Sequence, residues 1–197
     1  ILEKYRDPYL NLSVEEAILN EVNEGFASNT LRLWMNTPSL IIGSGQAISP
    51  SSLDLCLHRG IHVARRISGG GAVYHDEGNL NWSFTIKREG DSQGFLWAYE
   101  YFGTLIAESL KALRVQAYFV KPNRIDVDGK KISGMAGHFK PRAFLIHGTL
   151  LVRSDLKLLN QICPPIAGTP PVTSLEEVLG WRIEVETVTR MIFNFLS

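Results

Sequence analysis

The sequence predicts an α+β fold in which a mainly antiparallel sheet packs against helices. Residues 79–87 alternate strictly between polar and apolar side chains, which is the pattern of a strand with two unlike faces. Residues 95–113 place apolar side chains at helical spacing. Asp128-Gly129 separates two short strand-like runs, which indicates a hairpin. Because strands and helices do not alternate regularly along the chain, a parallel βαβ sheet is not expected.

The clearest boundary signals before residue 79 belong to one helix. Ser13 to Glu16 reads as a capping box, so this helix is expected to begin at Ser13, and Gly25 suits its end. The elements expected in this half are that helix, strands over 31–35 and 40–42 around the Pro38 turn, a short helix over 51–60 and a strand over 61–66.

The hairpin signal also predicts a register. A two-residue loop at Asp128-Gly129 places Asp126 opposite Lys131. The same register places Ile125 opposite Ile132. The elements expected in the rest of the chain are strands over 124–127, 130–133 and 145–152, short helices over 155–161 and 174–179, and a final helix over 186–196 that packs Val188, Ile192 and Phe195.

Composition narrows the class of protein. The chain has 197 residues, and 20 basic side chains balance 20 acidic ones, so the basic excess of a general nucleic-acid binder is absent. No apolar run approaches the roughly 18 residues of a membrane helix, and no signal peptide is expected. Cys56 and Cys163 make no disulfide framework. We expect a cytoplasmic protein that acts without nucleic acid or membrane.

The sharpest chemical feature is the glycine-rich segment over residues 65–76. Its three consecutive glycines, Gly69-Gly70-Gly71, allow the backbone to approach a ligand closely and to point several N–H groups at one anion. The neighbouring Arg66 is suited to phosphate or carboxylate. The segment has neither the P-loop ending nor the dinucleotide-binding spacing. On these residues alone, an anion site and a plain glycine-rich turn both stay open.

Two other segments carry candidate residues. Asp126 and Lys131 share one face of the predicted hairpin, where a solvated surface ion pair is the ordinary alternative to a functional role. His147 precedes an apolar run, and a lone histidine in such a place is more often structural than catalytic. The sequence offers no spacing of histidines that defines a metal site.

Together these segments resemble the lipoate–protein ligase family. The resemblance covers the chain from near its N-terminus to about Val152, and the order of its motifs is specific. The motifs are Asn11–Glu16, Arg65–Asp76 followed by Gly78–Asn81, Asn123–Asp126 with Gly129–Gly134, and His147–Leu151.

The resemblance implies a fold of the biotin/lipoate ligase type and a two-step reaction. ATP activates lipoate to lipoyl-AMP with release of pyrophosphate, and the lipoyl group then passes to a lysine. The implied acceptors are lipoyl domains of 2-oxoacid dehydrogenase E2 subunits or the glycine-cleavage H protein. Mg²⁺ is expected with ATP because divalent ions bridge phosphates.

The resemblance also implies roles for particular residues. Lys131 matches the family lysine that contacts the lipoate carboxyl and the phosphate, and it is the expected catalytic residue. No metal ligands are assigned, and Asp126 is a candidate only. The implied substrate-binding residues are Arg66, Ser68, Gly69, Gly70, Gly71, Ala72, Val73, Tyr74, Asn79, Asp126, Lys131 and His147.

Two departures from the family pattern shape the expected activity. No cysteine lies near Val120 or near Phe144, which counts against transfer through a thioester. Residues 1–197 are expected to form one catalytic domain without the family's C-terminal accessory domain, so a separate accessory subunit is expected to assist adenylation. The alternatives are a lipoyltransferase that uses preformed lipoyl-AMP and a non-catalytic binder of lipoate or adenylate.

Overall fold

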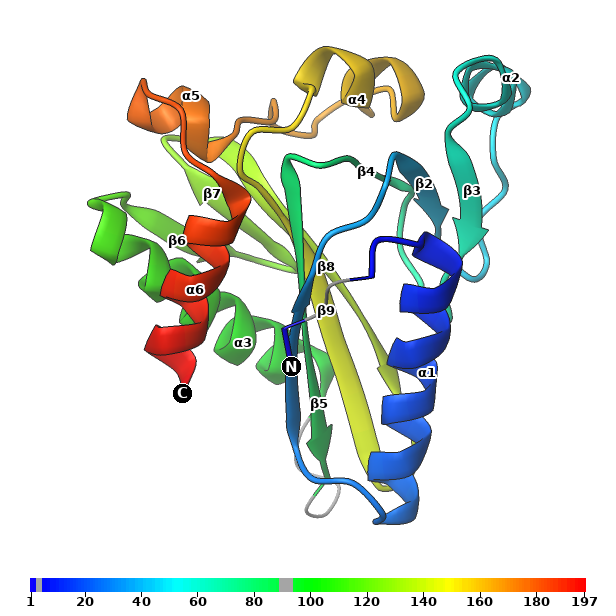
Figure 1. The fold of residues 1–197 in the computed structure, drawn as a ribbon, viewed down its shortest axis with the longest axis vertical. Coiled ribbons are helices and arrows are strands. Elements are labelled where there is room, and N and C mark those ends of the chain that lie inside the picture. The colour runs from blue at the N-terminus through cyan, green and yellow to red at the C-terminus, as the bar shows by residue number, and fades with distance from the viewer. Residues whose placement is uncertain (3–4, 89–93) are drawn as a thin grey trace.

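The larger of two sheets is antiparallel throughout. The computed structural model describes residues 1–2, 5–88 and 94–197, and within them six strands form this sheet in the order β1-β5-β9-β8-β7-β6 (Figure 1). All five neighbouring pairs are antiparallel. The strands are β1 Thr30–Trp34, β5 Asn79–Lys87, β6 Ala117–Val120, β7 Arg124–Val127, β8 Lys130–Phe139 and β9 Ala143–Leu151.

A smaller sheet stands beside it. Three of the described strands form it in the order β3-β2-β4, with β2 parallel to β3 and antiparallel to β4. The mainly antiparallel α+β fold predicted from the sequence is therefore confirmed. These strands are β2 Ser39–Ile42, β3 His62–Arg65 and β4 Val73–His75. The sequence prediction missed β4 and β6, which are only three and four residues long.

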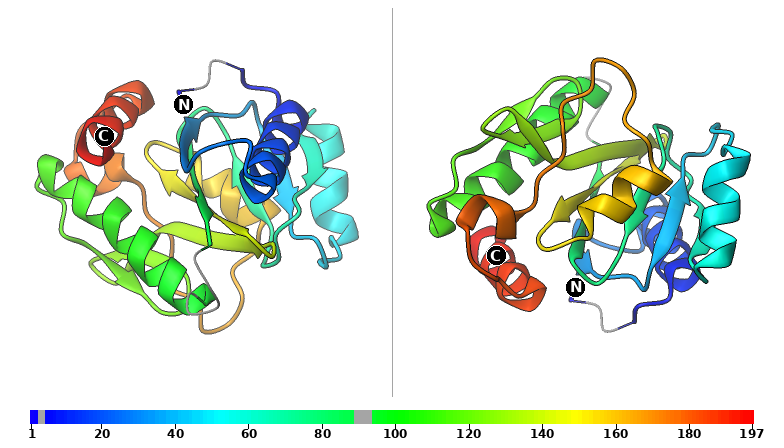
Figure 2. Two further views of the ribbon diagram at one scale, coloured as in Figure 1. Left: turned by 90° about the horizontal axis from the view of Figure 1, so that it is seen from below. Right: turned by 90° about the horizontal axis from the view of Figure 1, so that it is seen from above.

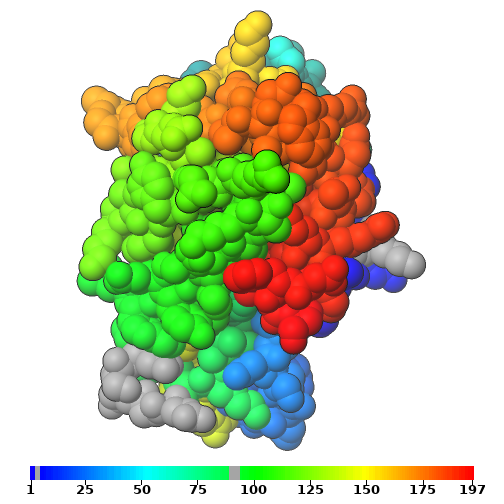
Figure 3. All heavy atoms as spheres, turned by 90° about the vertical axis from the view of Figure 1, so that its left-hand side faces the viewer, coloured from blue at the N-terminus to red at the C-terminus, as the bar shows by residue number. Residues whose placement is uncertain are grey.

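Helices cover the two faces of the main sheet differently. Helices α3 and α6 lie against one face, and Figure 3 shows them side by side on the outer surface of that layer. Helix α1 and the small sheet lie on the other side (Figure 2). The helices are α1 Pro8–Glu24, α2 Pro50–His58, α3 Phe95–Ser109 with a 3₁₀ turn η1 Leu110–Leu113, α4 Leu156–Ile162, α5 Leu175–Leu179 and α6 Val185–Leu196.

Strand β5 shows how the two layers arise from the sequence. Its apolar residues Leu80, Trp82 and Phe84 pack into the core beneath α3 and α6. Its polar residues, among them Asn81 and Ser83, are also buried, but they face α1 and the small sheet. Since buried polar groups need hydrogen-bond partners, this face of the sheet is the place for a polar network.

The start of α1 differs from the prediction. The helix begins at Pro8, and the Asp7 side chain caps it by accepting a hydrogen bond from the Leu10 amide at 2.9 Å. Ser13 lies inside the helix, where its hydroxyl donates to the Tyr9 carbonyl. The Asp-Pro pair is the stronger start signal, because proline suits the first helical position and aspartate the cap. The predicted end at Gly25 is confirmed.

The hairpin between β7 and β8 is confirmed in its turn and corrected in its register. Asp128 and Gly129 both have positive φ, 49° and 74°, as a tight two-residue turn requires. Asp126 pairs with Lys131 as predicted, but Ile125 pairs with Ser133 rather than with Ile132. Strand β8 therefore holds one extra residue at this point, which is a β-bulge.

The prediction for α6 was wrong in one residue. Val188 and Ile192 are buried, with Val185 on the same stripe, whereas Phe195 is 51% exposed. Helical spacing identifies the face of a helix, but tertiary packing decides whether its last turn meets a neighbour. Among the described helices, none is long and apolar enough to cross a membrane.

The core prediction concerns Phe144, which is fully buried at the start of β9 and packs its ring against Phe102 and Phe139. We expect Phe144→Ala to lower the free energy of unfolding by about 3–5 kcal/mol, because it leaves a large cavity. Phe195→Ala is the matched control and should cost less than about 0.5 kcal/mol. Chemical denaturation of both variants gives the measurement. Equal losses would contradict the burial assigned to either residue.

Candidate active site

A cleft opens between the polar face of the main sheet, α1 and the glycine-rich segment. Strands β1, β5, β8 and β9 supply its floor, and β4 and the residues before it supply one wall. Most of the residues predicted for the site meet here, although they come from three distant parts of the chain. Those that line the cleft are Arg66, Gly70, Gly71, Ala72, Val73, Lys131 and His147.

Five predicted residues do not line the cleft. Ser68 is fully buried behind it, and the carbonyl of Gly69 accepts a hydrogen bond from Arg66. Tyr74 points into the second core with Leu40 and Cys56, where burial, and then the Asp76 charge, raises its pKa to about 12. Asn79 donates to the Asn81 side chain at 2.9 Å. Asp126 is buried beside Lys131.

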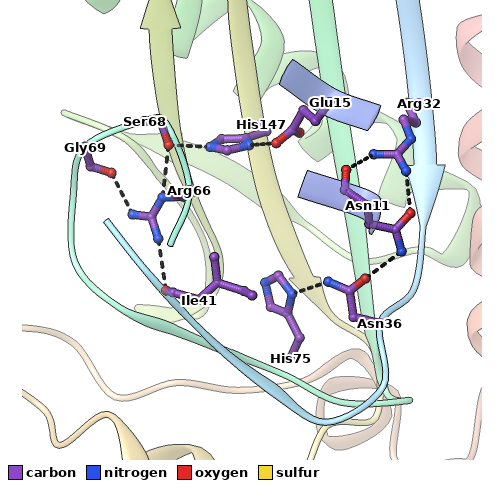
Figure 4. A network of polar contacts seen from close by, with 10 residues as sticks. All are labelled: Asn11, Glu15, Arg32, Asn36, Ile41, Arg66, Ser68, Gly69, His75 and His147. Atoms are coloured by element: carbon purple, nitrogen blue, oxygen red, sulfur yellow. Dashed lines mark hydrogen bonds and ion pairs between the residues drawn. The ribbon is translucent and has the colours of Figure 1, made fainter. Parts of the chain in front are cut away.

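Arg66 builds the shape of the glycine segment. Its Nη2 donates to the Gly69 carbonyl at 2.6 Å and its Nη1 to the Ile41 carbonyl at 3.1 Å (Figure 4). Its Nη2 also donates to the Gly71 carbonyl at 2.8 Å. Its Nε donates to Ser68 Oγ at 2.9 Å. The side chain is only 6% exposed, and burial lowers its pKa. The guanidinium thus draws the loop carbonyls inward, which leaves the loop N–H groups for other partners.

A chain of hydrogen bonds ties this segment to the sheet and to α1. Ser68 Oγ lies 2.6 Å from His147 Nε2, and His147 Nδ1 lies 2.8 Å from Glu15 Oε2 (Figure 4). The carboxylate holds the Nδ1 proton, so Nε2 faces the serine. Sequence reasoning missed Glu15. The helical spacing of Glu15 with Leu19 and Val22 could have identified it, because this spacing places a charged residue on the inward face of α1.

A second network holds His75, which was not among the predicted site residues. Asn36 Nδ2 donates to His75 Nδ1 at 3.0 Å, and Asn11 Nδ2 donates to Asn36 Oδ1 at 2.8 Å. Burial, followed by the charges of Arg66 and His147, lowers the pKa of His75 to about 3. His75 is therefore neutral near pH 7, with its proton on Nε2.

Several buried donors of the cleft lack protein partners. Within residues 1–2, 5–88 and 94–197, His75 Nε2, Trp34 Nε1 and Asn81 Nδ2 make no hydrogen bond. All three residues line the cleft. An unpaired buried donor costs about 1–3 kcal/mol. These donors could therefore hydrogen-bond to the acceptor atoms of a ligand or to water in the cleft.

Lys131 adds a positive charge to the cleft, which Arg66 also lines. Asp126, the partner of Lys131 in the surface ion-pair alternative, instead binds Arg124, whose Nε donates to both carboxylate oxygens at 3.1 and 3.0 Å. Burial, and then the Arg124 charge, lowers the pKa of Lys131. Its backbone is fixed, because its N–H donates to the Pro171 carbonyl and its carbonyl accepts from Thr173. The surface ion-pair alternative does not describe this lysine.

A glycine outside the predicted motif seats the glycine segment. A Cβ on Gly43, which follows β2, would overlap the Gly70 carbonyl. Gly70 itself has φ of 88°, which favours glycine, whereas a Cβ on Gly71 would meet no protein atom within 4 Å. Gly43 thus allows two backbones to touch, and Gly71 leaves open space on the ligand side.

The resemblance to lipoate–protein ligases is borne out by comparison. The model of the lipoyl protein ligase A/B catalytic domain matches residues 7–197. The chain therefore belongs to the lipoyl protein ligase A/B catalytic domain family. Its α+β fold is shared with solved lipoate-protein ligases.

Two relatives show the extent of the likeness. A protein of Aeropyrum pernix, provisionally named lipoate-protein ligase A, is 34% identical over 197 residues, covering 94% of this chain and 73% of that protein. Lipoate-protein ligase LplJ of Bacillus subtilis is 39% identical over 155 residues, covering 78% of this chain and 45% of that protein. The chain thus spans less than half the length of the Bacillus relative.

Solved structures show the same architecture. A lipoate-protein ligase A bound with ATP superposes with a TM-score of 0.86 at 27% identity, covering 100% of this chain and 83% of that one. LipL1 of P. falciparum in complex with lipoate gives 0.83 at 29%, covering 99% and 60%. A bi-partite lipoate protein ligase from Thermoplasma acidophilum, described with its E2 lipoyl domain, gives 0.82 at 25%, covering 100% and 81%.

The contact between Gly43 and the glycine segment gives a stability prediction. Gly43→Ala should lower the free energy of unfolding by about 1–3 kcal/mol, because the new methyl group displaces the Gly70 carbonyl. Gly45→Ala is the matched control, since a Cβ there meets no atom within 4 Å. Thermal unfolding compares the two variants, and an unchanged midpoint for Gly43→Ala would show that the segment yields without cost.

His75 gives a prediction on pH. Between pH 6.5, its ordinary pKa, and about 3, the unfolded chain holds a proton on this histidine that the folded chain does not. The free energy of unfolding therefore falls as pH drops through this window. We expect His75→Gln to reduce that fall, while exposed His58→Gln retains it. Denaturant titrations from pH 7 to pH 4 measure the slopes, and parallel curves for wild type and His75→Gln would refute the assignment.

Proposed function

We propose that this domain activates lipoate with ATP to lipoyl-AMP and transfers the lipoyl group to a lysine of a lipoyl acceptor domain. The observation that carries the proposal is the meeting, in one cleft, of the Lys131 ammonium and the glycine segment of an adenylate-forming family. Lipoate and ATP are named with solved relatives of the same fold. We also propose, as expected from the sequence, that the reaction takes place in the cytoplasm.

Lys131 acts on the carboxyl end of lipoate. Its ammonium has no hydrogen bond or ion pair within the described part of the chain, and it lines the cleft. It holds the carboxylate for attack on the α-phosphorus and neutralises the anhydride that forms. In the second step it stabilises the oxyanion that develops when the acceptor amine attacks the acyl carbon. The bond between the acyl carbon and the AMP oxygen breaks, AMP leaves, and an amide bond to the acceptor lysine forms.

The glycine segment acts on the phosphate. Arg66 fixes the loop carbonyls, so the N–H groups around Gly70 and Gly71 are available to an anion. The open space beside Gly71 gives the nucleotide room to approach the backbone. The apolar chain of lipoate needs a dry wall, and Leu12, Ile41 and Met135 line the same cleft.

The residues present do not build a metal cage. No group of three or more His, Cys, Asp or Glu side chains that could hold a metal occurs within residues 1–2, 5–88 and 94–197. Asp126, the sequence candidate, is 2% exposed and is occupied by Arg124. Mg²⁺ often binds largely through substrate phosphates and water, so we expect it to arrive with ATP. We assign it no protein ligand and no step.

The acceptor and an accessory subunit complete the proposal. The Thermoplasma ligase is bi-partite and is described with an E2 lipoyl domain. By analogy we propose that lipoyl domains of 2-oxoacid dehydrogenase E2 subunits, or the glycine-cleavage H protein, accept the lipoyl group here. We also propose that a separate accessory subunit assists adenylation, because closure around ATP must orient the reactants and exclude water.

One experiment tests the function and its alternatives. Lipoylation of one acceptor domain is followed by gel shift from lipoate plus ATP and from synthetic lipoyl-AMP, with and without candidate accessory protein. We expect transfer from lipoyl-AMP by the chain alone and rescue of the ATP-dependent reaction by the accessory protein. Transfer from lipoyl-AMP under all conditions, with no pyrophosphate release in any, would identify a lipoyltransferase. Binding without transfer would identify a non-catalytic binder.

Lys131 gives the matching variant prediction. Lys131→Ala should reduce transfer from lipoyl-AMP by about 100-fold or more, because the developing charge loses its cation. Lys131→Arg should also be poor, since the guanidinium is larger and planar. Lys130→Ala is the control, because its exposed side chain precedes Lys131 on the same strand and does not line the cleft. The reverse result, with Lys130 essential and Lys131 dispensable, would show that the wrong lysine was chosen.

A further inference from the structure

The side chain of Lys131 reaches the cleft because of a local irregularity in β8. Residues three apart in a regular strand point to opposite faces. In β8, Lys131 pairs with Asp126 and Ser133 pairs with Ile125, so one extra residue lies between two adjacent partners. This bulge resets the alternation and brings Lys131 and Gly134 to the same face. Bulges near active sites commonly re-aim a side chain in this way.

Gly134 leaves the space that the redirected side chain fills. A Cβ placed on Gly134 would lie 2.7 Å from Lys131 Nζ and 2.8 Å from its Cε. Both distances are shorter than a carbon makes with such atoms. The end of the lysine therefore lies directly over the bare backbone of Gly134, and both residues line the cleft.

The backbone of Gly134 gives no other reason for a glycine. Its φ lies outside the left-handed region, where Gly25, Gly70 and Gly129 are found. The atoms nearest to the added Cβ belong to the lysine and not to the backbone or the core. Because a lysine end is flexible, an alanine at 134 would move the ammonium rather than unfold the strand. The backbone of Lys131 would stay in place, held by Pro171 and Thr173.

We propose that Gly134 is a positioning residue for Lys131: the missing side chain lets the ammonium lie across β8 and point at the substrate carboxyl. This inference rests on the proposed function for its substrate, but the geometry concerns the protein alone. The bulge sets the direction of the lysine, and the glycine sets the height of its ammonium above the sheet. A methyl group at 134 raises the ammonium out of line with the carboxylate and the phosphate.

A double-mutant cycle tests the proposal. Calorimetry measures lipoate affinity in wild type, Gly134→Ala, Lys131→Ala and the double variant. We expect Gly134→Ala to weaken lipoate binding at least roughly tenfold in the wild-type background and less than about twofold in the Lys131→Ala background. Gly94→Ala is the control and should not change lipoate affinity, because Gly94 does not line the cleft and its added Cβ meets none of the described atoms within 4 Å. Equal losses in both backgrounds would show that Gly134 acts by shape alone and would overturn the proposal.

A second readout needs no substrate. Acetic anhydride labelling followed by mass spectrometry reports how fast each lysine reacts. Gly134→Ala should change the labelling of Lys131 at least about threefold and leave exposed Lys130 and the thermal midpoint unaltered. If wild type fails to bind lipoate but Lys131 labelling still responds, the proposed substrate is wrong and the positioning role stands. Unchanged labelling of Lys131 would overturn the positioning role even if lipoate binds.

Discussion

The cleft depends on one constraint: polar groups on the covered face of the main sheet need hydrogen-bond partners. Arg66, Ser68, His147 and Glu15 meet that constraint in a single run from the glycine segment to α1. An unsatisfied group here would cost about 1–3 kcal/mol. This chain of hydrogen bonds therefore stabilises the fold and also fixes the wall of the site. The glycine segment is therefore held by its own Arg66 and Ser68 together with side chains from β9 and α1.

One face of the main sheet packs the apolar core, and the other face lines the cleft. Under α3 and α6, fully buried side chains such as Trp82, Phe144 and Ile146 supply the large apolar core. Under α1 and the small sheet, residues on the same strands one position away are polar, and some of their donors have no protein partner. Substitutions on the first face are expected to act on folding, whereas the second face retains groups that only a ligand or water satisfies.

Local patterns in the sequence were enough for the parts of the fold that depend on local physics. Strand β5 and the Asp128-Gly129 turn follow from alternation and from the φ values that such a turn requires. The start of α1, by contrast, was predicted at Ser13 from a capping box, whereas the helix begins at Pro8 with Asp7 as its cap. The exposure of Phe195 depends on where the last turn of α6 lies relative to other elements, and no local pattern reports that.

The candidate site divides in the same way. Arg66, Gly70–Val73, Lys131 and His147 were predicted from sequence motifs and line one cleft. Glu15 and Gly43 were missed, because each acts on another protein group across a long sequence separation. The bulge in β8 was missed for a related reason, since a hairpin signal gives the turn but not an insertion further along the ladder.

Lys131 connects the local fold with the chemistry of the cleft. A half-buried ammonium whose nearest carboxylate is taken by Arg124 is costly, and the lowered pKa expresses that cost. The fold accepts it because the strand backbone is fixed on both sides and because Gly134 provides the space. In the proposed function, the substrate carboxylate would balance this charge. The ammonium would then already be in position for the reaction, which is the condition for electrostatic stabilisation without reorganisation.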